Sequence, residues 1–540
     1  MNSIKFSALT AMVLAMCVSV AQAESTVVTL VQTNDMHGRV ETDSPDQPAK
    51  GLVIIGSLVE QARKGAPDLL LFDCGDTLSG RPNSVVTRGR AILAAMNALG
   101  YDAMVMGNHE FDFGSESVKA ALATAKFPIL SANLIDESRD DEAWDPIQPY
   151  RVYTVRGVKV GVFGLTTINT MDFEYPGWIY PAKVVDPFKD AQQTVDHLRE
   201  NEGVDLVVAL THIGYKVDRE LAENVIGIDV ILGGHSHTFL EEQVWVGDTL
   251  IMQSGSYARA MGRIDILLDT KDTDGGGYKV VAYNGKDGRW WGHDGVPKPE
   301  SQLGQEVQYP GAILVRPTVD TPPHVGILAA YESYRPQVDE HLNERLAMIE
   351  SRIGAEGHRK HESPMGNLLA DAVRWSAGSD VGVYASSQFQ PVSFEAGPIN
   401  RHPLYRLITS YTRQHQVTVE TGGEQLRAML EAAVTPEGSV NLYISGAKLT
   451  PEIEMADGKA IDLSQRYIVA GAAHIMQDYM IGKPGVEILD DSTDARILRE
   501  ALAAYLKHLR LVSPPATDRL GLEATPPVGA SANESSGPVN

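Results

Sequence analysis

Three side chains that can take part in catalysis lie close together in the stretch Gly107–Asp112. Asn108 carries an amide oxygen that can bind a metal ion, His109 an imidazole, and Asp112 a carboxylate three residues further on. The stretch follows the apolar run 103–106, and a turn after a strand projects its side chains where α/β folds bind ligands. His109 is placed to donate a proton, and Asp112 can fix the tautomer of its imidazole. If Asp112 instead caps the helix that follows, His109 keeps its role but loses this partner.

Four other apolar, strand-like runs in the first half of the chain also end in residues of kinds that bind metals. The runs are 27–32, 69–72, 206–210 and 230–232. The residues that follow them are Asp35 and His37, then Asp76, then His212, then His235 and His237. Asp35 and His37 are two positions apart, so they point the same way if the chain stays extended. Any one of these residues alone can be structural, but five runs that end alike indicate a metal site.

The elements that must position these residues alternate between strands and helices. Helical patterns cover 52–63 and 91–99, and a strand at 158–163 brings no such residue. This alternation predicts parallel βαβ units, whose strands are buried on both faces. Because the C-terminal ends of parallel strands share one edge, we expect all five groups of residues at one edge of one sheet.

The candidate ligands define the kind of metal site. Histidine nitrogens, carboxylates and one amide oxygen suit Zn, Mn or similar first-row ions rather than a soft thiolate site. Seven candidate ligands exceed what one tetrahedral ion takes, whereas two ions bridged by one carboxylate fit. Paired ions clamp the attacking and leaving oxygens of an in-line displacement and lower the pKa of a bound water. The residues therefore predict hydrolysis that depends on two divalent ions.

Composition limits the choice of partners. The 540 residues are 43% apolar and 21% charged, which is typical of a globular protein with more than one domain. The formal net charge of −24 argues against a nucleic-acid polymer as partner. A small anionic substrate would need a local positive centre, such as metal ions, to offset this charge.

The first residues have the pattern of a secretory signal peptide. Lys5 precedes the apolar run 8–20, and the small residues Ala21 and Ala23 mark a cleavage site after Ala23. No later run reaches the length of a membrane span. We therefore expect a protein that is periplasmic or secreted.

The second half of the chain has a different pattern. Residues 321–353 read as a connecting helix on either side of Pro336, and a second composition begins near Gly354. Helices are expected at 365–376, 426–433 and 495–509, and strands at 381–384, 416–419 and 467–470. The end of the chain, 521–540, is rich in Pro, Gly and Ser and is expected to be disordered.

Together the motifs resemble the calcineurin-like metallophosphoesterase domain and are most similar to the secreted bacterial 5'-nucleotidase family. The motifs are Asn34-Asp35-Met36-His37-Gly38, Gly75-Asp76-Thr77, Gly107-Asn108-His109-Glu110-Phe111-Asp112-Phe113-Gly114, Thr211-His212 and Gly234-His235-Ser236-His237. Residues 365–372 resemble the start of the family's C-terminal substrate domain. The resemblance implies an α/β protein with a four-layer metallophosphoesterase sandwich at 24–320. It also implies a connecting helix at 321–353 and a smaller α/β substrate domain at 354–520.

The resemblance also assigns roles to single residues. It implies that one ion is held by Asp35, His37, Asp76 and His237. It implies that the other is held by Asp76, Asn108, His212 and His235, so that Asp76 bridges the two ions. His109 and Asp112 match the catalytic dyad. The implied function is hydrolysis of phosphate monoesters, nominally 5'-nucleotides, by metal-bound hydroxide. The substrate domain is implied to swing the substrate to the metals about the connecting helix.

The second half departs from the family pattern where the family binds its nucleoside. Residues 385–391 lack the family's Gly-Gly pair and its substrate-binding Arg, and Asn441 stands where a base-stacking aromatic is expected. Phe389, Tyr411 and Tyr443 are aromatic residues that could compensate. Arg413, Tyr411 and His474 are the candidates for a rebuilt pocket. The departures predict weak affinity for nucleotides.

Two other functions compete with this one. A related metallohydrolase could act on a non-nucleotide phosphate ester or on a sulfur ester, although the related thiosulfate-cleaving enzymes have Trp where His109 stands here. A non-catalytic binding protein could use the same fold, but such a protein has no need to keep both His109 and Asp76. We therefore expect a monomeric enzyme whose partner is a small phosphate ester.

Overall fold

The structure is a computed structural model that describes most of the chain. The described residues are 25–41, 51–139, 142–173, 179–269, 278–284, 289–292, 296–298, 314–409, 414–449, 453–491 and 497–522. The predicted signal peptide, most of the predicted disordered tail, and the candidate pocket residues Tyr411 and Arg413 lie outside these ranges. Among the described helices, none has both the length and the apolar character needed to span a membrane.

The first of two large sheets contains β1, the first strand of the chain. It has the order β17-β16-β15-β14-β1-β2-β3-β4, with β18 paired to β14. Its strands are β1 (Thr26–Thr33), β2 (Leu70–Asp73), β3 (Ala103–Val105), β4 (Ile129–Leu130), β14 (Met261–Asp269), β15 (Lys279–Asn284), β16 (Trp290–Trp291), β17 (Pro297–Lys298) and β18 (Leu314–Val315). Strands β1 to β4 are parallel, whereas β14 runs antiparallel to β1.

The second sheet has the order β12-β13-β11-β10-β8-β7. Its strands are β7 (Tyr150–Val155), β8 (Val158–Thr166), β10 (Leu206–His212), β11 (Val230–Gly233), β12 (Val244–Val246) and β13 (Thr249–Met252). The four central strands are parallel and the two edge strands are antiparallel. The prediction of one sheet was therefore wrong, because β1, β2 and β3 belong to one sheet and β10 and β11 to the other.

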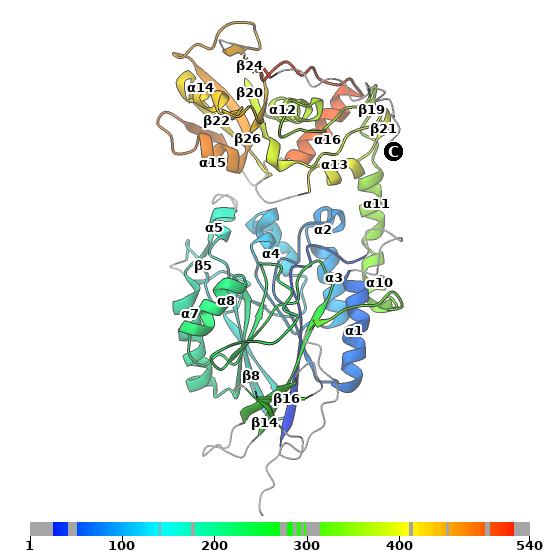
Figure 1. Cartoon of the computed structure of the whole chain (residues 1–540), viewed down its shortest axis with the longest axis vertical. Helices are drawn as coiled ribbons and strands as arrows, with labels where there is room; N and C mark the ends of the chain where they lie inside the picture. The colour runs from blue at the N-terminus through cyan, green and yellow to red at the C-terminus, as the bar shows by residue number, and fades with distance from the viewer. Residues whose placement is uncertain are drawn as a thin grey trace, which may run out of the picture.

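The two sheets pack face to face, and helices cover both outer faces (Figure 1). Along β10, Leu206, Val208 and Leu210 lie in the core between the sheets, while Val207 and Ala209 pack under the helices. This two-sided burial explains the continuous apolar runs. The covering helices are α1 (Leu52–Gly65), α3 (Arg90–Leu99) and α4 (Ser115–Leu122) on the first sheet, and α7 (Pro187–His197) and α8 (Tyr215–Asn224) on the second. The predicted four-layer α/β sandwich is confirmed.

Two short helices link the sandwich to the C-terminal domain. Helix α10 (Val325–Glu332) packs on α1 and α3, and α11 (Arg335–Asn343) packs on α2 (Pro82–Thr87). Pro336 lies in the first turn of α11, where a missing N–H costs nothing, so it begins a helix rather than interrupting one. The predicted helix over 321–353 is thus wrong in extent, since β19 (Ala347–Ile349) follows and joins a sheet of the C-terminal domain.

The C-terminal domain stacks on the end of the sandwich where α2, α4 and α5 (Thr170–Phe173) lie (Figure 1). Its main sheet has the order β23-β20-β26-β22-β27, and a small sheet has the order β21-β19-β28. The strands of the main sheet are β20 (Val381–Ala385), β22 (Gln416–Gly422), β23 (Leu442–Ser445), β26 (Arg466–Ala472) and β27 (Glu487–Asp490). The small sheet adds β21 (Gly397–Ile399) and β28 (Leu511–Val512). The helices are α12 (Pro364–Ala377), α13 (His402–Leu407), α14 (Gly423–Glu431), α15 (Ala473–Tyr479) and α16 (Leu498–Leu509).

Candidate metal centre

The predicted ligands come together at the C-terminal ends of strands from both sheets. Five of the seven predicted ligands have a left-handed backbone conformation. These are Asp35, His37, Asp76, His235 and His237, with φ between 47° and 74°. Such values are uncommon for residues other than glycine and cluster at functional sites. The chain at Asp35 and His37 is therefore not extended, and the two side chains meet because the loop turns.

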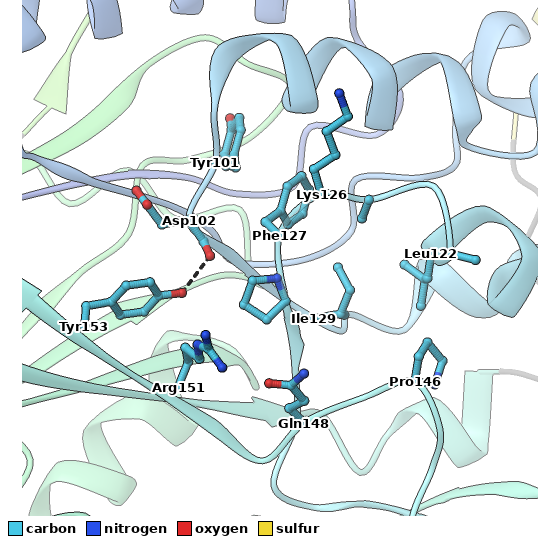
Figure 2. A pocket seen from close by; sticks show the side chains of 13 residues that line it. Tyr101, Asp102, Leu122, Lys126, Phe127, Ile129, Pro146, Gln148, Arg151 and Tyr153 are labelled. Atoms are coloured by element: carbon cyan, nitrogen blue, oxygen red, sulfur yellow. Dashed lines mark hydrogen bonds between the residues drawn. The ribbon is translucent and has the colours of Figure 1, made fainter. Parts of the chain in front are cut away.

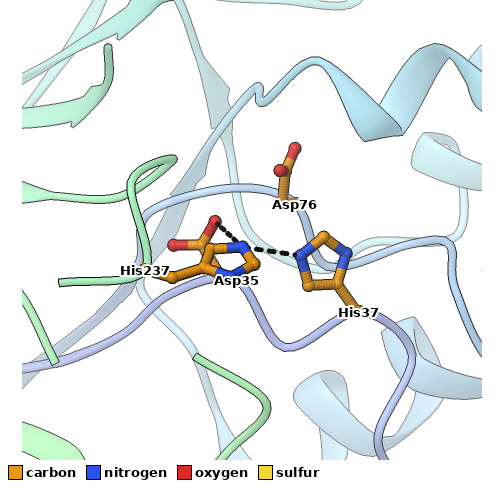
Figure 3. Close-up of side chains that lie close together, drawn as sticks. All are labelled: Asp35, His37, Asp76 and His237. Carbon is orange, nitrogen blue, oxygen red and sulfur yellow. Dashed lines mark hydrogen bonds and ion pairs between the residues drawn. The ribbon is translucent and has the colours of Figure 1, made fainter. Parts of the chain in front are cut away.

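A first ligand set comprises Asp35, His37, Asp76 and His237, each of which offers one atom within 4.8 Å of the others. Figure 3 shows the four side chains converging, with Asp35 and His37 on one loop and Asp76 and His237 each on another. The Nε2 atoms of His37 and His237 are 3.0 Å apart, and Nε2 of His237 is 3.2 Å from Oδ1 of Asp35. The main-chain N–H of His235 also donates to the Asp35 carboxylate, which fixes the orientation of that carboxylate.

A second ligand set comprises Asp76, His212 and His235, again within 4.8 Å. Nε2 of His212 is 3.1 Å from Oδ2 of Asp76. Asn108 lies in the turn that follows β3. The main-chain N–H of the next residue, His109, donates to Oδ1 of Asp76 at 2.9 Å. Asp76 thus belongs to both sets, which is the arrangement that a bridging carboxylate needs.

Several buried polar atoms fit a bound cation. Nδ1 of His212 lies 2.6 Å from the carbonyl oxygen of Cys74, which can only accept, so Nδ1 must carry the proton. In the neutral ring the lone pair of Nε2 then faces the Asp76 carboxylate without an aligned hydrogen bond. The buried Oδ1 of Asn108 also has no hydrogen-bond partner in the described part of the chain. Two facing electron-rich groups of this kind need a positive charge between them.

The pKa shifts agree with a site for cations. Burial lowers the pKa of His37 well below its usual value, although the Asp76 carboxylate acts in the opposite direction. Burial and then His212 lower the pKa of His235 to about 4. Both rings are neutral at physiological pH, which is the form that binds metals. Burial alone would lower the pKa of His212, but Asp76 raises it to about 10, so this pair attracts a proton or a metal ion.

The His109 side chain lies beside this centre and pairs with Asp112. Nδ1 of His109 is 3.1 Å from each carboxylate oxygen of Asp112, which also accepts a hydrogen bond from the Ser79 hydroxyl. The His109 side chain is 27% exposed and that of Asp112 is 1% exposed. The alternative that Asp112 caps the next helix does not hold, because α4 begins after Gly114 without a side-chain cap. The arrangement leaves Nε2 of His109 as the atom that can exchange a proton.

Glu110, which the sequence reasoning passed over, holds two of the ligand loops together. Its fully buried carboxylate accepts main-chain hydrogen bonds of 2.7–3.0 Å from Asp76, Thr77, Leu78 and Gly107. Burial raises the pKa of this carboxyl group. The sequence offered one weak signal, an acidic residue placed inside the turn that carries Asn108 and His109.

The candidate residues for the substrate pocket are placed differently. Phe389 and Tyr443 are buried in the core of the C-terminal domain, and the Tyr443 hydroxyl donates to the main-chain oxygen of His358. The hypothesis that these two rings replace missing base-stacking residues was therefore wrong. His474 lies at the start of α15 and is mostly buried. Burial and then His474 lower the pKa of His415 to about 4, while Asp112 of the sandwich acts in the opposite direction, so His415 is close enough to interact electrostatically with Asp112.

A cavity of about 580 Å³ lies away from this centre (Figure 2). Its walls include Tyr101, Phe127, Arg151 and Tyr153. Tyr101 precedes β3, whereas the ligands and the dyad follow it, so the cavity lies toward the other end of that strand. It plays no part in the candidate centre.

Comparisons with known proteins agree with the geometry. A family model described as calcineurin-like phosphoesterase matches residues 28–239, and one described as 5'-nucleotidase, C-terminal domain, matches residues 344–480. The trifunctional nucleotide phosphoesterase protein YfkN of Bacillus subtilis is 35% identical over 66% of this chain and 24% of its own length. The 5'-nucleotidase of Rattus norvegicus is 32% identical over 65% of this chain and 60% of its own length. The chain thus spans less than two thirds of these curated relatives.

A solved structure covers more of the fold. The 5'-nucleotidase precursor from Thermus thermophilus has a TM-score of 0.60 and 25% sequence identity, and the match covers 92% of this chain and 99% of that one. The family resemblance inferred from the motifs is therefore confirmed. The chain belongs to the 5'-nucleotidase family, with a calcineurin-like phosphoesterase domain followed by a 5'-nucleotidase C-terminal domain.

Proposed function

We propose that this protein is an exported phosphohydrolase with two divalent ions that hydrolyses phosphate monoesters, nominally 5'-nucleotides. The observation that carries the proposal is a pair of ligand sets that share Asp76, with the His109–Asp112 pair beside them. A sulfur-ester hydrolase or a binding protein would not account for this pairing as directly.

Different residues of the chain bind the ions, orient the catalytic imidazole and support the ligand loops. One ion would be held by Asp35, His37, Asp76 and His237, and the other by Asp76, Asn108, His212 and His235. When bound, the ions supply Lewis-acid polarisation of the phosphoryl group and acidify water, and the nitrogen and oxygen ligands suit Zn or Mn. Asp112 accepts from Nδ1 of His109, which orients the imidazole and presents Nε2 to the leaving oxygen. Glu110 keeps the Asp76 and Asn108 loops at a fixed separation.

The substrate domain supports a broad rather than a strict specificity. Residues 385–391 contain no Arg, and Phe389 and Tyr443 are buried. His474, together with Tyr411 and Arg413, remains a candidate for contact with the substrate. We propose that the division between the domains lies at α10 and α11, that the chain acts as a monomer, and that residues 1–23 direct its export. The relatives named 5'-nucleotidase support this placement of the function.

The test combines metal analysis with a panel of phosphate esters. The purified mature chain should contain up to two equivalents of a first-row divalent metal. A chelator should abolish hydrolysis of AMP and of 4-nitrophenyl phosphate, and Zn or Mn should restore it. A chain that binds both ions but hydrolyses no ester on the panel would overturn the enzymatic proposal and favour a binding protein.

A further inference from the structure

Arginine and aromatic side chains alternate in a row beside the first ligand set. The guanidinium carbon of Arg39 lies 4.6 Å from the centre of the Tyr257 ring. That of Arg259 lies 5.5 Å from the same ring and 4.7 Å from the Phe239 ring, which Arg316 approaches at 5.2 Å. Contacts of this kind between cations and ring faces are favourable. We call these five residues the arginine–aromatic row.

The row is in contact with residues of the metal centre. The ring of Tyr257 is centred 5.3 Å from the rings of both His37 and His237. The main-chain N–H of Tyr257 also donates to the main-chain oxygen of Asp35 at 2.8 Å. A group bound on this row would therefore lie next to a phosphoryl group held at the centre.

The backbone under the row is held in a fixed, uncommon shape. Tyr257 and Ala258 have φ of 62° and 50°, in the left-handed region that residues other than glycine rarely adopt. Gly255, with φ of 82°, packs so closely against the Phe239 ring that any Cβ would collide with it. Strained backbone of this kind persists where the surroundings fix it, often at ligand sites.

Among the described residues, no acidic side chain neutralises the charge of Arg259. Its guanidinium donates to the main-chain oxygen and to the hydroxyl of Ser256, both at 3.0 Å, and both groups are neutral. Arg316, by contrast, forms two hydrogen bonds with the Glu241 carboxylate. In the described part of the chain no carboxylate pairs with Arg259. An oriented, exposed and unneutralised guanidinium is suited to bind an anion from solution.

We infer that Tyr257 and Arg259 form a second anion subsite, which binds an anionic group of the substrate beyond the scissile phosphate. The inference rests on the proposed function. It assigns the preferred substrates to a class, phosphate monoesters that carry a second anionic group such as a carboxylate or another phosphate. It also provides a positive anchor on the catalytic domain in place of the Arg that is missing from residues 385–391.

Matched esters that differ in one charge test the inference. Phenyl phosphate and 4-carboxyphenyl phosphate present the same ring, and only the second carries the extra anion. The wild-type chain should have a KM for the carboxylated ester that is about ten- to hundredfold lower, as expected for one charge-assisted hydrogen bond. Arg259→Gln should remove this difference in KM between the two esters.

Arg151→Gln is the matched control, because Arg151 is an exposed arginine of the same domain that lines the separate cavity in Figure 2. It should keep the full preference for the carboxylated ester. If both variants lost the preference for the carboxylated ester equally, the preference would come from the long-range charge of the protein, and the subsite would be overturned. Equal KM values for the two esters in the wild-type chain would also overturn it.

Binding of the corresponding phosphonates, which resist hydrolysis, separates this inference from the proposed function. Calorimetry on the metal-loaded chain should show tighter binding of 4-carboxyphenylphosphonate than of phenylphosphonate, and Arg259→Gln should abolish the difference. If no ester is hydrolysed but this difference is found, the proposed function fails and the subsite stands. If esters are hydrolysed but the phosphonates bind equally well, the subsite fails and the function stands.

Discussion

At the scale of single residues, Asp76 and His109 should have separable roles. Asp76→Ala removes the carboxylate common to both ligand sets, so metal content and activity should both be lost. His109→Ala leaves both sets intact, so the chain should keep its metal and lose about 10²–10⁴-fold in kcat, as is typical for a general acid. Metal analysis and kinetics on the same preparations check both. A metal-free but folded His109→Ala chain would contradict the division between ligands and dyad.

Glu110 supplies a second prediction at this scale. Glu110→Gln would turn an amide N–H toward main-chain N–H groups that now donate to the carboxylate. We expect metal affinity to fall about 10–100-fold, as for other groups that support metal ligands, and the free energy of unfolding to fall by about 1–3 kcal/mol. Glu116→Gln, at an exposed position nearby, should change neither. Calorimetric metal titration and thermal unfolding measure the two effects, and an unchanged metal affinity would deny Glu110 this supporting role.

The sequence could identify the kinds of ligand, but not how their loops are built. The residue types at Asp35, His37 and Asp76 predict a metal site, whereas their left-handed conformations depend on hydrogen bonds from distant loops. The role of Glu110 was not predicted for the same reason. Apart from Gly107, its hydrogen-bond partners lie more than thirty residues away in the sequence. Local pattern does not encode partners of this kind.

At the scale of elements, apolar runs predicted the strands, but not the sheet to which each belongs. The runs before Asp76 and His212 look alike because both strands are buried on both faces. What separates them is pairing, since β2 lies between β1 and β3 while β10 lies between β8 and β11. Long-range contacts decide which strands pair. The sequence therefore predicted that the ligands follow the C-terminal ends of strands, but not that these strands belong to two sheets.

The close approach of two loops at Gly107 gives a prediction for these elements. A Cβ added at Gly107 would overlap the Asp76 carboxylate and its main-chain nitrogen, so Gly107→Ala must push the loops after β2 and β3 apart. We expect the free energy of unfolding to fall by about 1–3 kcal/mol, the usual cost of overpacking, together with a loss of metal affinity. Gly422→Ala is the control, because among the described residues only its own chain neighbours lie within 4 Å of the added Cβ. Equal melting temperatures for the two variants would contradict this account.

At the scale of the whole molecule, α11 is attached to both domains. Arg335 binds Glu41 of the sandwich at 2.5 Å, while His341 lies 2.9 Å from the Tyr405 hydroxyl of the C-terminal domain. If the substrate domain turns about Tyr334 during turnover, α11 must slide on α2. A disulfide across the contact between α2 and α11 should then reduce kcat, and reduction should restore it. Equal kcat in the oxidised and reduced forms would move the hinge beyond Asn343, toward the stretch Gly354–Gly357.

The substrate domain shows where prediction from sequence is weakest. Helices and strands fall close to their expected places, as in α12 and β20. The pocket does not, because a buried core aromatic such as Phe389 and a ring that stacks on a base have the same sequence signature.

Substrate preference is the property of the whole molecule that most needs measurement. Loss of a base-stacking ring costs about 1–3 kcal/mol where such stacking has been measured in nucleic-acid binding, and loss of a charged Arg contact about 1.5–3 kcal/mol. With Asn441 in place of a ring and no Arg in 385–391, we expect measurable but weak activity on 5'-nucleotides and little discrimination between bases.

Activity on some aryl or sugar phosphate should equal or exceed activity on AMP, because the groups around the metal centre act on the phosphoryl group whatever its ester. Saturation kinetics on AMP, GMP, CMP and UMP beside aryl and sugar phosphates decide the question, and phenyl phosphate provides the ester without a nucleoside. A micromolar KM for AMP with strong purine preference would show that other residues have replaced the missing contacts, and strict 5'-nucleotidase specificity would then stand.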